Sequence, residues 1–361
     1  MTAHVARPAG VSTPDLGLLR RLTEVVGVSG DEAAVRSIVV REVQDLADDL
    51  HVDALGNLLV VRRGQGPRRL RVMVAAHLDE VGLMILGADS DGRFFFEAVG
   101  HLDTSQLPGK ALWIGPERVV GVIGIPPPHL QREPDSHGPF PLEELRIDIG
   151  ETSRQAALAR VRPGMWASYA TPFQRQANSL FGRALDNRVG VATLVSLVRQ
   201  PPRGIELLAA FTTQEEIGGR GARVAAQALE PDCALVLDCT PARDILPDED
   251  ALAWRVNTRL GHGPALYFAD GDTVYDAGWA NHIRRTAERR GLAYQIRQPG
   301  GGGTDAGTIQ IAGHGIPCAA ISVPARNVHG AVSHAYLSDW RTSLLLVQAA
   351  LASLTPAEFR R

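Results

Sequence analysis

The stretch LRVMVAAHLD, residues 70–79, indicates the fold, because its apolar run is broken only by Arg71 and ends in His77-Leu78-Asp79. A continuous apolar run of this length is typical of a strand that is buried on both faces. Two further runs of the same kind occupy residues 205–211 and 233–237. Such strands belong to a sheet that is covered by other elements on each side.

Helical patterns alternate with these strands. Residues 31–47 carry apolar side chains at helical spacing, with two acidic residues at the start, where the helix dipole favours them. Further helical segments are predicted at 188–198, 220–229, 279–290 and 339–354, and a hairpin is predicted at 51–61. Alternating buried strands and helices predict an α/β domain with three layers, α/β/α, and a mostly parallel sheet.

One long stretch departs from this alternation. Residues 86–173 contain no long helical pattern apart from 153–160, and they carry short strand-like runs and many prolines. We interpret this stretch as a small, mostly β domain that is inserted into the α/β domain. The α/β domain is then formed by residues 1–85 and 174–361.

The composition excludes several classes of protein. Hydrophobic residues make up 45% and charged residues 21% of the 361 positions, which is typical of a globular protein. The net charge of −3 gives no bias toward nucleic acid or anionic membranes, and no apolar run is long enough to span a bilayer. The N-terminal residues lack the apolar segment of a signal peptide, and the three cysteines form no CxxC pair. We therefore expect a cytoplasmic protein with no nucleic-acid or membrane partner.

Residues able to bind metal follow the three buried strands. The first strand ends at His77, the second is followed by Glu215 and Glu216, and the third ends at Asp238. In open α/β sheets ligands bind beyond the carboxyl ends of the strands, so these groups are expected to converge on one crevice. Imidazole and carboxylate groups suit divalent metals such as Zn, Co or Mn.

Two further residues complete a set of two histidines and three carboxylates. Asp186 directly precedes a predicted helix, and His329 follows the apolar run 319–323. If one aspartate bridges two metal ions, one histidine and one carboxylate remain for each ion, and Glu215 is left over as a base. Taken singly, each residue has an ordinary alternative: Asp186 as a helix N-cap, and Glu215-Glu216 as a solvated turn. The joint pattern favours the metal site.

Five segments together resemble the M42 family of metalloaminopeptidases, the glutamyl-aminopeptidase and tetrahedral-aminopeptidase-like enzymes. They are AAHLDEVG (75–82), ALDNR (184–188), TQEEIGGRGA (213–222), GGTDA (302–306) and RNVH (326–329). The resemblance extends, in order, from about residue 18 to about residue 354. It implies two divalent ions, Zn, Co or Mn, with Asp186 bridging them. The ligands that it implies are His77, Asp186, Glu216, Asp238 and His329.

The same resemblance implies roles for two acidic neighbours and for the insertion. It implies that Glu215 is the general base and that Asp79 orients the imidazole of His77. It also implies that the insertion is a PA-like β domain used in assembly, through which dimers build a closed tetrahedral dodecamer. Candidate contact groups on this domain are Phe140, Trp113 and Trp166.

Three positions depart from the common pattern of the family: Asn187, Asn327 and Gly330. Asn187 follows the proposed bridging aspartate and is not itself an implied ligand. Asn327 and Gly330 flank a histidine that is kept, so they bear on the shape of the pocket rather than on metal binding.

The predicted function is the removal of N-terminal residues from peptides by a metal-dependent aminopeptidase. A metal-activated water attacks the scissile carbonyl, and Glu215 takes its proton and passes it to the leaving amine. Two alternatives remain: a related dinuclear-metal deacylase or carboxypeptidase, and a non-catalytic assembly protein on a peptidase scaffold. Turnover of aminoacyl-anilides, of N-blocked substrates, or of neither distinguishes the three.

Overall fold

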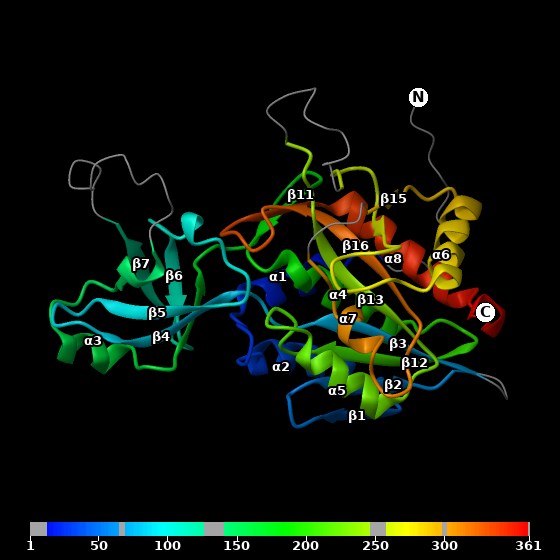
Figure 1. The fold of residues 1–361 in the computed structure, drawn as a ribbon, viewed down its shortest axis with the longest axis horizontal. Coiled ribbons are helices and arrows are strands. Elements are labelled where there is room, and N and C mark those ends of the chain that lie inside the picture. Colours follow the sequence, from blue (N-terminus) through cyan, green and yellow to red (C-terminus); the bar gives the residue numbers. More distant parts are fainter. Residues whose placement is uncertain (1–12, 65–68, 126–140, 246–257, 298–301, 360–361) are drawn as a thin grey trace.

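The computed structural model describes residues 13–64, 69–125, 141–245, 258–297 and 302–359. A large sheet with helices on both faces forms the bigger part of the molecule, and a small β-barrel stands at one end of it (Figure 1). Within these residues no helix is both long and apolar enough to cross a membrane. Phe140, one of the expected contact groups, lies outside the described residues.

Four parallel strands form the centre of the sheet. The strands on its main path are β1 (Asp49–Val52), β2 (Leu58–Arg62), β3 (Leu70–His77), β10 (Gln174–Gln176), β11 (Ser179–Gly182), β12 (Ile205–Thr212), β13 (Cys233–Pro241), β16 (Cys318–Arg326) and β17 (Ser333–Tyr336). Their order in the described residues is β1-β2-β12-β3-β13-β16-β17-β11-β10, and β14 (Ala265–Leu266) and β15 (Gln295–Ile296) lie off this path. Along this path β12, β3, β13 and β16 pair in parallel, and off the path β14 pairs in parallel with β15.

The mostly parallel sheet expected from the sequence is limited, on the main path, to these four strands. On both sides of them the strands pair antiparallel, through the hairpins β1–β2, β16–β17 and β10–β11. Connections of a few residues can join only antiparallel neighbours, whereas parallel neighbours need a long crossover. The sheet is therefore mixed, and the apolar runs that suggested parallel strands are those of its buried centre.

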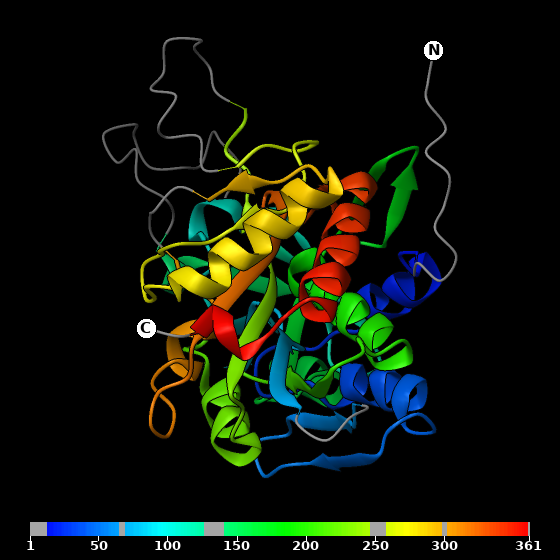
Figure 2. The same ribbon diagram turned by 90° about the vertical axis from the view of Figure 1, so that its right-hand side faces the viewer.

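Helices cover both faces of the sheet (Figures 1 and 2). One face carries α1 (Leu16–Glu24), α2 (Ala33–Val43), α4 (Leu185–Arg199), α6 (Ala277–Arg290) and α8 (Leu337–Ala352). The other face carries α5 (Arg220–Leu229) and α7 (Ala306–Ile309). The sequence patterns predicted α2, α4, α5, α6 and α8, whereas α1 and the single turn of α7 were not predicted.

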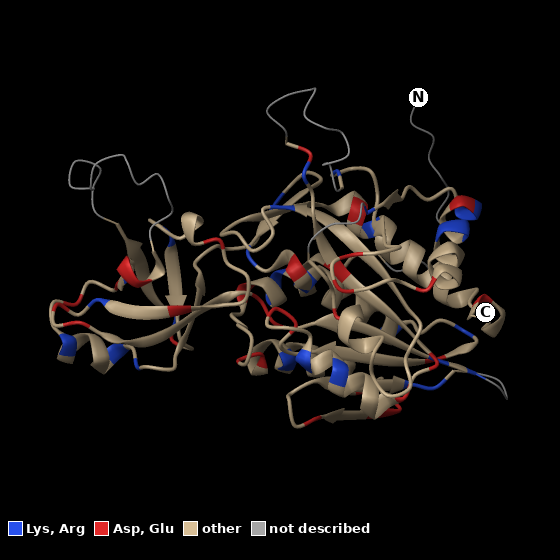
Figure 3. Ribbon diagram, viewed as in Figure 1, with Lys and Arg blue, Asp and Glu red and all other residues tan. Residues whose placement is uncertain are grey.

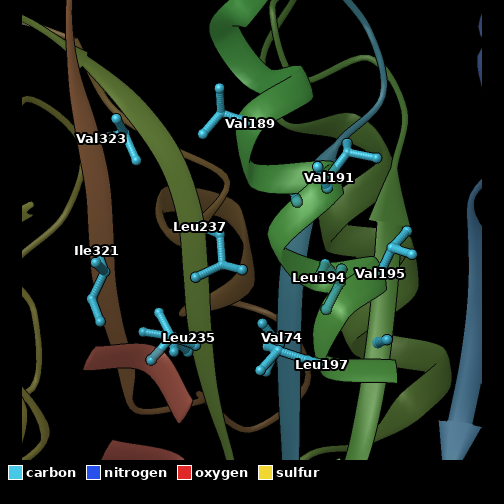
Figure 4. Packing of buried hydrophobic residues seen from close by; sticks show 14 of the residues in the cluster. Val74, Val189, Val191, Leu194, Val195, Leu197, Leu235, Leu237, Ile321 and Val323 are labelled. Atoms are coloured by element: carbon cyan, nitrogen blue, oxygen red, sulfur yellow. The ribbon is translucent and has the colours of Figure 1, made fainter. Parts of the chain in front are cut away.

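Alternation along the central strands produces a separate core on each face. In β3, Val72, Val74 and Ala76 belong to the cluster beneath α4, whereas Met73 and Ala75 belong to the cluster beneath α5. Successive side chains of a strand point to opposite faces, so a run that is apolar throughout fills both cores. Figure 4 shows the first core, in which side chains of β3, β13 and β16 lie opposite those of α4.

The barrel forms a third core of its own. Its strands are β4 (Gly82–Ala88), β5 (Phe94–Val99), β6 (Ala111–Ile114), β7 (Val119–Gly124), β8 (Arg146–Asp148) and β9 (Trp166–Tyr169). They close in the order β4-β5-β8-β7-β6-β9 around a separate apolar cluster. Helix α3 (Arg154–Arg160) lies between β8 and β9 in the sequence. The start expected at residue 86 falls inside β4, because the chain enters the barrel at Gly82.

A buried ionic cluster joins the barrel to the sheet. Glu80 receives hydrogen bonds from the side chains of Arg183 and Arg188, and from Ser168 Oγ in β9 (2.9 Å). Glu80, Arg183 and Arg188 are at most 3% exposed. The guanidinium carbon of Arg183 also lies 5.6 Å from the ring centre of Trp113 in β6. Trp113, an expected contact group for other subunits, thus contacts its own chain at this junction.

Candidate metal centre

Four polar residues meet at one edge of the sheet because their strands run parallel. His77 is the last residue of β3, and Asp238 lies near the end of β13. Glu216 follows β12 after a short turn, and His329 follows β16. Parallel strands place their carboxyl ends at the same edge, and Asp186 reaches this edge from the start of α4.

Asp186 lies between the two histidines. Its Oδ1 is 3.3 Å from Nε2 of His77, and its Oδ2 is 3.6 Å from Nε2 of His329. Nε2 of His77 is also 3.5 Å from Oδ1 of Asp238, and Nε2 of His329 is 3.0 Å from Oε2 of Glu216. Nε2 of each histidine therefore faces Asp186 and one further carboxylate.

The donor atoms fit a divalent metal ion. One atom each from His77, Asp186 and Glu216 lies within 4.8 Å of the other two. Oδ1 of Asp186 is buried and has no hydrogen-bond partner among the described residues. Imidazole nitrogen together with carboxylate oxygen is a donor set that Zn, Co and Mn accept. These residues therefore form a candidate metal site.

Asp186 does not act as the N-cap of α4. The N-cap position is Ala184, and no side chain caps the helix there. The next residue, Asn187, instead makes two hydrogen bonds: its Oδ1 accepts from Gly190 N (3.0 Å), and its Nδ2 donates to Leu237 O (2.7 Å). These bonds fix the start of α4 against β13 and leave the carboxylate of Asp186 facing the histidines.

Backbone carbonyls orient both histidines. Nδ1 of His77 donates to the carbonyl of Asp79 (3.1 Å), and Nδ1 of His329 donates to the carbonyl of His101 (3.0 Å). A hydrogen bond at one ring nitrogen fixes the tautomer and directs the other nitrogen toward a metal. The carboxylate of Asp79 lies farther away, with Oδ1 3.6 Å from Nδ1 of His77.

The carboxylate of Asp79 holds the turn that carries the two glutamates. Its Oδ1 accepts from Glu215 N (3.0 Å), and its Oδ2 accepts from Glu216 N (3.1 Å) and from Ser29 Oγ (2.6 Å). Glu216 is only 5% exposed, so the alternative of a solvated turn does not describe it. Glu215 is half-buried and lines the cleft in front of the cluster.

Negative charge is concentrated at this site, and Figure 3 shows acidic segments where the barrel meets the sheet. Burial would lower the pKa of His329, but the carboxylates of Asp186 and Glu216 outweigh it and raise that pKa to about 11. Burial raises the pKa of Asp238 to about 7, and the charge of Asp186 adds to this effect. Burial also raises the pKa of Glu215 well above its usual range. A divalent cation bound here offsets the repulsion among these carboxylates.

A cleft of about 770 Å³ opens in front of the cluster and contains a residue that the sequence did not single out. Arg297 lines this cleft, is 5% exposed, and donates from Nε to Thr240 Oγ1 (3.2 Å). Its guanidinium carbon lies 5.0 Å from the ring centre of Tyr267, which also lines the cleft. Arg297 follows the two-residue strand β15 outside the quoted motifs, so no sequence signal identified it.

The quoted segment GGTDA supplies a buried carboxylate to which the sequence analysis gave no role. Asp305 is 1% exposed, and its Oδ2 accepts a hydrogen bond from Thr212 Oγ1 (2.5 Å). Thr212 ends β12 and pairs in register with His77. The GGTDA segment is therefore tied to the strand end beside the cluster.

The loop that carries His329 contains two of the departures from the family pattern. Gly330 N donates to the carbonyl of Asn327 (3.0 Å), and Asn327 Nδ2 donates to the carbonyl of Val332 (3.3 Å). Asn327 and His329 both have positive φ angles, 55° and 63°. This tight turn, closed by its own hydrogen bonds, presents the histidine to the cleft.

A mixed sheet with imidazole and carboxylate groups gathered at the carboxyl ends of its parallel strands defines a metal-dependent hydrolase of the α/β class. The sequence model of the M42 glutamyl aminopeptidase family matches residues 56–346. A lysyl aminopeptidase of Pyrococcus furiosus is 31% identical over 96% of this chain and 99% of its own length. The chain belongs to the M42 glutamyl aminopeptidase family, and it is a metal-dependent aminopeptidase.

Solved structures agree with this assignment. An aminopeptidase from the archaeon Desulfurococcus kamchatkensis matches with a TM-score of 0.89 and 29% identity, over 96% of each chain. The TET1 peptidase of Pyrococcus horikoshii, described as able to assemble into a tetrahedron or a large octahedral shell, matches with a TM-score of 0.81 and 33% identity. That match covers 94% of this chain and 99% of the other.

We expect the two adjacent glutamates to respond differently to loss of charge. Glu216→Gln should lower the metal content of the purified protein, because Glu216 lies in the cluster, 3.0 Å from His329. Glu215→Gln should keep the metal and lose about 10²–10⁴-fold in kcat, the usual contribution of a general acid–base group. Metal analysis and kcat of both variants check this.

Glu206→Gln, at the opposite end of β12, is the control and should change neither quantity. Loss of metal from Glu215→Gln, with full retention in Glu216→Gln, would contradict the assignment.

Proposed function

We propose that the chain holds two divalent metal ions that share Asp186. His77 and Asp238 would complete one site, and His329 and Glu216 the other. The observation that carries this proposal is that the two oxygens of Asp186 face different histidines, each of which also faces one further carboxylate. When bound, the ions supply an acidic water and neutralise charge that develops on the scissile carbonyl.

Glu215 is proposed as the base that takes a proton from that water. It lines the cleft beside the cluster, and its backbone amide is held by Asp79. After the attack the same carboxyl group hands the proton to the leaving amine, as the two steps of peptide hydrolysis require. Asp79 is proposed to support both His77, through its carbonyl, and the glutamate turn, through its carboxylate.

Metal removal tests this function directly. Chelation should abolish release of the chromophore from aminoacyl-anilides, and Zn, Co or Mn should restore it. The reason is that no group in the cluster of three carboxylates and two imidazoles can take the place of the ions. Full activity of chelated, metal-free protein would contradict the dinuclear proposal. Cleavage of N-blocked substrates instead would favour a deacylase, and no turnover of either would favour an assembly protein.

The domain division proposed from the sequence is a catalytic domain of residues 1–85 and 174–361 with an inserted domain over 86–173. It is supported by the closed barrel and by the apolar cluster inside it, which is separate from the clusters of the sheet. We propose that the barrel is a PA-like domain used in assembly. A reducing, cytoplasmic setting is proposed as well, supported by the cysteines Cys233, Cys239 and Cys318, which are free and buried.

Self-association through the barrel is proposed because apolar side chains lie on its outer surface. Val120 and Val122 of β7 are 62% and 42% exposed, and Leu86 of β4 is 52% exposed. Contiguous exposed apolar patches on a protein surface commonly mark sites of contact with other proteins. The shell described for the TET1 peptidase supports the same idea.

Light scattering of the purified protein should therefore give the mass of a closed homo-oligomer, most simply a dodecamer built from dimers. Replacing Val120 and Val122 by aspartate should shift the protein to smaller species, because buried charge at an interface is costly. Arg93→Ala, an exposed change on the same barrel, is the control. A wild-type monomer with full peptidase activity would remove the assembly proposal.

Arg297 supports a preference for substrates with an acidic N-terminal residue. Asp238 and Thr240 are two residues apart in β13, so their side chains lie on the same face of the sheet, about 7 Å apart. Arg297 donates to Thr240, and both Arg297 and the proposed metal ligand Asp238 line the cleft. A substrate whose α-amine lies at the metals can therefore extend its first side chain toward the guanidinium.

Arg297→Met should lower kcat/KM on a glutamyl-anilide by about 10–100-fold, since a hydrogen bond to a charged group contributes about 1.5–3 kcal/mol. Turnover of a leucyl-anilide should change much less, because its side chain does not use the positive charge. Arg243→Met, on the exposed rim of the same cleft, is the matched control. A wild-type enzyme that prefers lysyl-anilide over glutamyl-anilide would overturn this preference.

A further inference from the structure

A loop near the N-terminus lies directly against the segment that follows His77. Val28 forms a parallel bridge with Glu80, Ser29 N donates to the carbonyl of Glu80 (3.3 Å), and Glu80 N donates to the carbonyl of Gly27 (3.0 Å). This loop precedes α2 and lies outside residues 56–346, the part of the chain that the family model matches. No residue of the loop is among the implied ligands or the implied base.

Glu32, at the end of this loop, does not cap its own helix. It occupies the N-cap position of α2, but its side chain makes no capping hydrogen bond there. Its Oε1 accepts instead from Gly30 N (2.7 Å) and from Gln214 N (3.2 Å), a residue 182 positions away in the sequence. Glu32 is only 4% exposed, so its carboxylate is buried in the protein interior.

Together, Glu32 and Asp79 hold three consecutive backbone amides. Glu32 accepts from Gln214 N, and Asp79 accepts from Glu215 N and from Glu216 N. Gln214 has a φ angle of 57°, a left-handed conformation that is unfavourable for a residue with a side chain. Such a conformation persists only where its surroundings hold it in place, and the hydrogen bond from Gln214 to Glu32 does so.

The buried carboxylates of Glu32 and Asp79 repel each other, so other groups must offset this repulsion. The three backbone amides stabilise the two carboxylates by donating hydrogen bonds, and Ser29 Oγ adds a further hydrogen bond to Asp79. The buried guanidinium of Arg188 lies close enough to Glu32 and Asp79 to interact with both charges. Each carboxylate accepts from the turn 214–216 as well as from the loop before α2, so the pair ties the turn to this loop.

We propose that Glu32 is a positioning residue for the metal centre: it fixes the turn at Gln214 so that Glu216 reaches the metal and Glu215 faces the substrate. The inference rests on the proposed roles of these two glutamates. Removing the acceptor frees the amide of Gln214 and lets the turn relax, which loosens the geometry of both side chains. Loss of a partner that orients a metal ligand typically costs 10–100-fold in metal affinity.

The test compares Glu32→Ala, Glu32→Gln and Asp31→Ala. Glutamine keeps an oxygen acceptor of the same length, whereas alanine removes it. Asp31 is the matched control, because it lies one residue away, is exposed, and makes its backbone hydrogen bond to Val28 rather than to the turn 214–216. Each purified protein is stripped of metal and titrated with Co²⁺, whose visible absorption reports coordination. Thermal unfolding and the kcat and KM for an aminoacyl-anilide are measured on the same samples.

Glu32→Ala should bind Co²⁺ about 10–100-fold more weakly and lose about 10-fold or more in kcat with KM nearly unchanged. Glu32→Gln should stay within about threefold of wild type in both, and Asp31→Ala should match wild type. Unchanged Co²⁺ affinity and kcat in Glu32→Ala, with only a lower unfolding temperature, would overturn the proposal. So would a Glu32→Gln variant as impaired as Glu32→Ala. A wild-type protein that binds no Co²⁺ and cleaves no anilide would instead reject the proposed function.

Discussion

The parallel pairing of β12, β3, β13 and β16 is the constraint on which the active site depends. It brings the carboxyl ends of strands from distant parts of the sequence to one edge, with Thr212 beside His77 and Asp238 beside Ser322. A slip of one residue would turn every side chain of a strand to the wrong core, and a slip of two would move a ligand by about 7 Å. The two apolar cores thus fix the register, and the register places the side chains of the candidate metal site.

The three residues after β3 connect this edge to the rest of the molecule. The carbonyl of Leu78 accepts from Arg188 of α4, the carboxylate of Asp79 holds the glutamate turn, and Glu80 binds Arg183, Arg188 and the barrel. Buried ion pairs add little net stability when intact, but removal of one partner costs about 3–5 kcal/mol. Residues 78–80 therefore contribute mainly by fixing the positions of α4, the glutamate turn and the barrel relative to His77.

Local sequence patterns predicted what depends on local order. The long apolar runs gave the central strands, and helical spacing gave α2, α4, α5, α6 and α8, because those patterns come from burial of a face. The strand ends and the family motifs pointed to the residues that face one another around Asp186. Edge strands as short as Gln174–Gln176 carry no pattern, so the mixed nature of the sheet was not predictable. Arg297 and Glu32 lie outside the quoted motifs, and their partners Thr240 and Gln214 are distant from them in the sequence.

The barrel is more closely joined to the metal centre than the sequence suggests. Residues 86–173 supply none of the proposed ligands, so the insertion could be regarded as separate from the chemistry. Yet the carbonyl of His101 accepts the hydrogen bond that orients His329, and His101 lines the cleft. Ser168 of the barrel also donates to Glu80, one residue beyond the aspartate that holds the glutamate turn. A displacement of the barrel relative to the sheet would therefore break the bond that orients His329, so contacts made by the barrel act on the geometry of the candidate site.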